Sequence, residues 1–136
     1  MPCNLFNSRI NAIALSFRSM KQYDSAIFYF NIIYDTAALR NDVAWMGITQ
    51  GNLGIIYYLL KEYSQAEPLL KKDIETSILT GNNIRNAVNS MTVLAKIYYD
   101  AVLRKISNSQ RRIASQKQPE IVRYPGRIEI RKTKIG

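Results

Sequence analysis

The stretch "NLGIIYYLLKEYSQAEPLL" at residues 52–70 decides the fold, because its pattern occurs more than once in the chain. Forty residues earlier, "AIALSFRSMKQYDSAIFYF" at 12–30 places lysine, tyrosine, alanine and aromatic side chains at matching positions. A third copy begins with "TVLAKIYYD" at 92–100, after a spacing of forty-one residues. Self-similarity at a fixed period of this length indicates stacked supersecondary units.

Each copy predicts two helices separated by a short break. The apolar residues of the first helix recur at i, i+4 and i+7, which places them on one helical face. They are Ile13, Phe17 and Met20 in the first copy and Leu53, Tyr57 and Leu60 in the second. We expect helices near 7–20, 24–39, 43–60, 64–79 and 84–103.

Polar and glycine residues mark the expected helix ends. Ser64 with Glu67 has the spacing of a capping box at the start of a second helix, and Asp24 is the candidate cap of the equivalent helix. Asn41 and Gly81 follow the second helices and suit the left-handed conformation that often ends a helix.

Small residues recur inside the first helices. Gly54 costs its helix about 1 kcal/mol relative to alanine, and this cost makes sense if two helices must approach closely there. We expect Gly54 to cross the second helix at Ala66. By the same argument Ala14 should cross at Ala26, and Ala95 is the matching small residue of the third copy.

At these positions the chain resembles a tetratricopeptide (TPR) repeat, in the longer forty-odd-residue form of kinesin-light-chain-like repeats. The motif "LGxxYxxxxxYxxAxxxL" is present as Leu53, Gly54, Tyr57, Tyr63, Ala66 and Leu70. The resemblance covers about residues 7–103, with units near 7–46, 47–86 and 87–103, the last incomplete. It implies an all-α, right-handed superhelix of antiparallel helix pairs. Asp73 departs from the pattern, since the family usually packs an alanine there.

The resemblance also implies a binding face. In TPR proteins one face of the first helices lines a concave groove that holds peptides, often extended ones. The corresponding residues here are Asn11, Arg18, Ile55, Tyr58, Thr92, Lys96 and Tyr99. Their cations and tyrosines suit a peptide with an acidic group. The alternative interpretation is an ordinary face that is solvated or packed against neighbours.

The residues that enzymes need are scarce. The chain has no histidine, which removes the usual general base and the commonest metal ligand. The single Cys3 forms no internal disulfide and no zinc cluster. No phosphate-binding loop or nucleophile elbow is present either. We therefore expect no enzyme, no cofactor and no metal.

With no enzyme expected, the sequence favours a scaffold whose function is to bind a protein or peptide. The resemblance implies a part of a larger signalling or assembly protein, such as the sensor region of a bacterial regulator. No apolar run reaches the ~18–20 residues of a membrane span, and no secretory signal is visible. We accordingly expect a cytoplasmic protein.

The net charge of +9 is concentrated at the end of the chain. Residues 1–100 contain nine Lys/Arg and eight Asp/Glu, whereas residues 101–136 contain ten and two. The segment "EIVRYPGRIEIR" alternates like a hairpin around Pro125–Gly126, but an isolated two-stranded hairpin is marginal in water. We expect a flexible basic tail over 104–136.

Three interpretations of this tail stay open. It is a basic arm for nucleic acid or anionic lipid, a solvated linker, or the out-of-frame or truncated end of a longer repeat protein. The first gives the alternative function, a nucleic-acid-binding protein. In addition, the third unit ends after one helix, so Ile97, Val102 and Leu103 are expected to lack a partner and to promote weak stability or self-association.

Overall fold

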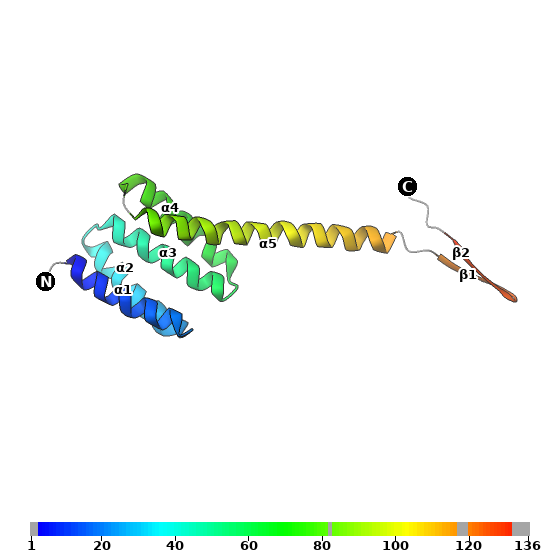
Figure 1. The fold of residues 1–136 in the computed structure, drawn as a ribbon, viewed down its shortest axis with the longest axis horizontal. Coiled ribbons are helices and arrows are strands. Elements are labelled where there is room, and N and C mark those ends of the chain that lie inside the picture. Colours follow the sequence, from blue (N-terminus) through cyan, green and yellow to red (C-terminus); the bar gives the residue numbers. More distant parts are fainter. Residues whose placement is uncertain (1–2, 82, 117–119, 132–136) are drawn as a thin grey trace. The chain divides into compact units, whose positions relative to one another are not determined.

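A computed structural model describes residues 3–81, 83–116 and 120–131. Five helices precede two short strands in this part of the chain (Figure 1). The elements are α1 Cys3–Ser19, α2 Tyr23–Leu39, α3 Val43–Leu59, α4 Tyr63–Thr80, α5 Ile84–Gln116, β1 Glu120–Tyr124 and β2 Arg127–Arg131. They fall into two compact units, Met1–Ile97 and Tyr98–Gly136. The all-α class expected for the repeat region is confirmed.

The turn after α3 shows why the first three helices have such regular ends. The amide of Lys61 donates to the carbonyl oxygen of Tyr58 at 2.9 Å, and the amide of Glu62 donates to that of Tyr57 at 2.8 Å. These two bonds form a Schellman motif, which satisfies the last carbonyls of the helix. Lys61 adopts the left-handed conformation that the motif requires, with φ at 62°.

The same turn follows α1 and α2. Lys21 and Asn41 are also left-handed, with φ at 59° and 54°, so a turn residue recurs every twenty positions. The predictions for Asn41 and for Gly81, whose φ is 65°, are confirmed. The two lysines were not expected in this role. Because the turns are short, α1–α4 run antiparallel to their neighbours and pack against them in chain order.

Both side-chain caps expected for the second helices are wrong. α4 begins at Tyr63 with Glu62 as its N-cap, and α2 begins at Tyr23; neither N-cap residue makes a side-chain cap bond. Ser64 and Asp24 consequently lie inside the first turn. The Schellman turn explains the shift, because it fixes where the next helix starts.

The packing between successive repeat units follows the same forty-residue period as the sequence. One buried cluster contains Ala14, Ala26, Phe30, Ile33, Leu53 and Ile56, and the next contains Ala66, Leu70 and Ile97. Ala26, Phe30 and Ile56 of the first cluster stand at the repeat-equivalent positions of Ala66, Leu70 and Ile97 in the second. The half of α5 that lies in the first unit thus packs as α3 does. Ile97 is buried, so the expectation that it lacks a partner is wrong.

Three residues expected on the buried face are exposed. Met20 and Leu60 come directly after the last residues of α1 and α3, where the chain turns away from the core; they are 57% and 40% exposed. Ile13 is 41% exposed although its equivalent, Leu53, is buried. Leu53 packs against the preceding helix pair, α1 and α2, whereas no helix pair precedes α1 in the described part of the chain.

The close crossing at Gly54 is confirmed. A Cβ atom built on Gly54 would lie 2.8 Å from Cγ of Leu70 and 3.2 Å from the carbonyl oxygen of Ala66, closer than real side chains pack. α3 and α4 therefore approach this closely at Gly54 because Gly54 has no side chain. Ala95, the matching residue of α5, is exposed, because no described helix follows α5 to cross it.

The flexible tail expected over 104–136 is not confirmed, because two of its segments have regular secondary structure. α5 continues to Gln116, because residues 104–116 contain no Gly or Pro and are rich in helix formers, and extending an existing helix needs no new nucleus. β1 pairs antiparallel with β2, with Tyr124 opposite Arg127. Gly126 has a φ of 78°, which the third position of a type II turn requires. Residues 117–119 and 132–136 of the expected tail lie outside the described residues.

We expect Gly54→Val to lower the free energy of unfolding by about 1–3 kcal/mol, because the added methyl groups overlap Leu70. Urea denaturation followed by circular dichroism measures this loss. Ala95→Val is the matched control at the exposed equivalent position, and it should cost no more than ~0.7 kcal/mol of helix propensity. Equal losses in the two variants would contradict the close crossing.

Candidate functional site

Asn52 joins α1 to α3 on the face of the first helices. Nη1 of Arg18 donates to Oδ1 of Asn52 at 3.2 Å, and Nδ2 of Asn52 donates to Oδ1 of Asn11 at 3.3 Å. Two predicted site residues, Asn11 and Arg18, therefore meet at a residue that the sequence reasoning missed. Burial lowers the pKa of the Arg18 guanidinium, and the nearby Tyr23 partly opposes this shift. Arg18 thus holds helices together and is less open to a ligand than expected.

Ile55 and Tyr58 of α3 also have packing roles. Both are partly buried and pack against the cluster formed by Ala66, Leu70 and Ile97. The Tyr58 ring stacks on the Tyr63 ring, with centroids 5.7 Å apart. Each side chain keeps some exposed surface. The alternative interpretation, in which this face packs against neighbouring helices, therefore applies to part of each side chain.

The predicted residues on α5 are exposed. The Thr92 hydroxyl donates to the carbonyl oxygen of Val88 at 2.8 Å within the helix. Lys96 lies on the surface of the first unit. Tyr99 is 64% exposed and belongs to the second unit. The peptide-binding role of the seven predicted residues stays a prediction.

A polar recess lies between α3, α4 and α5. Its lining residues are Ile48, Gly51, Asn52, Ile55, Asp73, Asn86, Asn89 and Ser90. Asp73 is only 1% exposed, and its Oδ2 accepts a hydrogen bond of 2.5 Å from the Ser90 hydroxyl. The Ser77 hydroxyl lies 3.5 Å from Oδ1, at the limit of a hydrogen bond. In the described part of the chain no Lys or Arg forms an ion pair with Asp73.

Gly51 makes room for the Asp73 carboxyl group. A Cβ atom built on Gly51 would overlap that carboxyl group and lie 2.9 Å from Oγ of Ser90. Burial raises the pKa of Asp73, and the two serine hydroxyls partly oppose this shift. The sequence marked Asp73 as a departure from the repeat pattern. It contained no sign that Gly51, forty residues after Asn11, was the compensating change.

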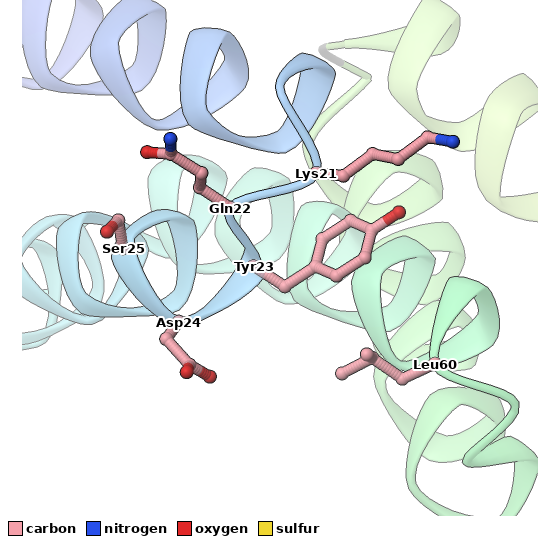
Figure 2. A pocket seen from close by; sticks show the side chains of 6 residues that line it. All are labelled: Lys21, Gln22, Tyr23, Asp24, Ser25 and Leu60. Atoms are coloured by element: carbon pink, nitrogen blue, oxygen red, sulfur yellow. The ribbon is translucent and has the colours of Figure 1, made fainter.

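A second, wider pocket lies at the turn between α1 and α2. It is lined by Lys21, Gln22, Tyr23, Asp24, Ser25 and Leu60. In the view of Figure 2 the Tyr23 ring extends from the turn, with Lys21 on one side of it and Leu60 on the other. All of these side chains are exposed or partly exposed, so the pocket holds no desolvated polar group comparable to Asp73.

The described residues contain no group of three or more His, Cys, Asp or Glu side chains that could hold a metal ion. No helix among them is both long enough and apolar enough to cross a membrane. No protein-family model matches the chain, and neither the curated proteins nor the solved structures contain a match.

The raised pKa of Asp73 predicts a pH-dependent stability. A carboxyl group whose folded-state pKa exceeds its ordinary value of 3.8 stabilises the fold fully below that value. This contribution is lost as the pH rises through the folded-state pKa. Relative to the wild type, Asp73→Asn should therefore gain stability as the pH rises from acidic to neutral.

Urea unfolding of both proteins across this pH range measures the difference. Asp35→Asn removes an exposed aspartate from α2 and is the matched control. A constant difference between wild type and Asp73→Asn at all pH values would show that burial does not raise this pKa.

Proposed function

We propose that the chain is a TPR-type scaffold that binds a protein or an extended peptide on the face of α1, α3 and the first half of α5. One observation carries the proposal. Asn52 contacts α1 through Asn11 and Arg18 and also lines the recess that α5 completes with Asn86 and Asn89. Side chains of α1, α3 and the first half of α5 thus contribute to one face, which contains both polar and apolar residues.

The chemistry of this face suits a peptide. Ile55 and Tyr58 leave part of their apolar surface open to solvent. Lys96 places a cation on α5, the helix that also contributes Asn89 to the lining of the recess. Aromatic and apolar side chains supply most binding energy at interfaces, while charges at the rim orient the partner. The role in a larger signalling or assembly protein, and the cytoplasmic location, belong to the same proposal.

Peptide display against the full chain tests the proposal. We expect enriched peptides to bind with an affinity that Lys96→Glu lowers by about 1–3 kcal/mol, measured by isothermal titration calorimetry, with helicity unchanged. Lys72→Glu on α4 makes the same charge change at another exposed lysine. A library that yields no binder, or equal losses from both variants, would refute the proposed face.

Nucleic-acid binding is the second candidate, and it concerns the second unit alone. Residues 101–116 of α5 contain no Asp or Glu. Their exposed cations are Arg104, Lys105, Arg111 and Arg112. Four cations within about two and a half turns of helix can neutralise several phosphates.

If these cations bind duplex DNA, the Arg111→Gln/Arg112→Gln variant should reduce the slope of log affinity against log salt. The expected reduction is about 0.9 for each phosphate that the variant no longer neutralises. Fluorescence anisotropy over a salt series measures the slope. The Lys71→Gln/Lys72→Gln variant removes two exposed cations from α4 as a control. Undetectable DNA binding at low salt would exclude this function.

A further inference from the structure

We propose that the recess beside Gly51 binds the ammonium group of a lysine side chain in the partner peptide, with the Asp73 carboxylate as its counter-ion. The inference rests on the proposed function, because it assigns a ligand group to that binding face. It concerns only residues of the first unit, and the site shares only Ile55 with the expected groove residues.

The first argument is the unbalanced charge of Asp73. A carboxylate that is removed from water without a cation is strongly disfavoured, because the desolvation cost has no opposing ion-pair energy. Ser90 provides one short hydrogen bond and Ser77 a long one. An ionised carboxylate has about four acceptor positions, so the group retains capacity for a cationic donor.

The second argument is the size of the space beside this carboxylate. The recess has room for about one water-sized group, and an ammonium group is of that size. The planar guanidinium of arginine is larger. A divalent metal needs several oxygen ligands, and the described residues provide no cluster of acidic or histidine side chains here.

The third argument is the chemistry of the rim. Asn52, Asn86 and Asn89 line the recess, and their amide oxygens are neutral acceptors for the remaining protons of an ammonium group. Asn89 is exposed and Asn86 is partly exposed, whereas Asp73 and Ser90 are buried. The recess therefore has its buried charge at the floor and its open side at the asparagines.

Apolar side chains complete the fit. Ile48 and Ile55 belong to the same lining. Lysine buries its methylene stem against apolar surface while its charged head reaches a polar group. A lysine that enters past Asn89 can do both, whereas a free alkali cation would gain nothing from the two isoleucines.

The test uses the full chain and methylammonium chloride as the probe, at constant ionic strength. The amide resonances of Gly51 and Ser90 are followed by NMR as the probe is added. We expect a saturable shift of both resonances. Tetramethylammonium chloride, which has no N–H donor and is too large for the recess, should produce none.

Two variants locate the response. Asp73→Asn keeps the shape of the side chain and should abolish the shift, while Asp35→Asn should retain it. Gly51→Ala keeps the Asp73 residue but places a methyl group where its carboxyl group lies, so it should displace that group and also abolish the shift. Circular dichroism confirms the helical fold of each variant before titration.

A wild-type protein without a saturable shift overturns the inference on its own, as does an undiminished shift in Asp73→Asn. If displayed peptides bind in a manner that depends on Lys96 but methylammonium has no effect, the proposed function stands and only the ammonium site fails. If methylammonium binds but no peptide does, the recess exists and the proposed function fails.

Discussion

The crossing of α3 and α4 at Gly54 is the contact on which the packing of α5 depends. It brings the backbone of α3 against Ala66 and Leu70. Those two residues then form, with Ile97, the cluster that holds α5. A bulkier residue at this position would have to displace Leu70, one of the residues on which α5 packs. The helix-propensity cost of one glycine, about 1 kcal/mol, is small compared with the burial that it permits.

Asp73 and Gly51 show how one interface of a repeat can depart from the others. An apolar side chain at position 73 would extend the buried cluster, as Ile33 does at the equivalent position of α2. The carboxyl group instead lies between three helices, and it fits only because Gly51 leaves space. A buried carboxyl group adds little to stability, which agrees with the ligand-binding role proposed for Asp73 of α4.

Sequence reasoning succeeded where the cause was local. The starts of α3 and α5 and the left-handed residues Asn41 and Gly81 follow from hydrophobic period and turn chemistry. It failed at the capping box of Ser64, because a Schellman turn centred on a lysine sets the start of α4. The flexible tail expected beyond residue 104 is not confirmed, because residues 104–116 contain no Gly or Pro and continue α5. Of the seven predicted site residues, the structure joins Asn11 and Arg18 through Asn52, and the peptide-binding role of all seven stays a prediction.

The sequence by itself determined the helix pairs, their forty-residue period and the small residues at which they cross, because each depends on the spacing of side chains along one segment. Only the tertiary structure decided which faces are covered. Leu53 is buried and its equivalent Ile13 is exposed, since burial depends on a neighbouring helix pair. The same holds for the recess, where Gly51, Asp73 and Ser90 come from three helices. No period in the sequence relates these three residues, so their contact exists only once α3, α4 and α5 have packed.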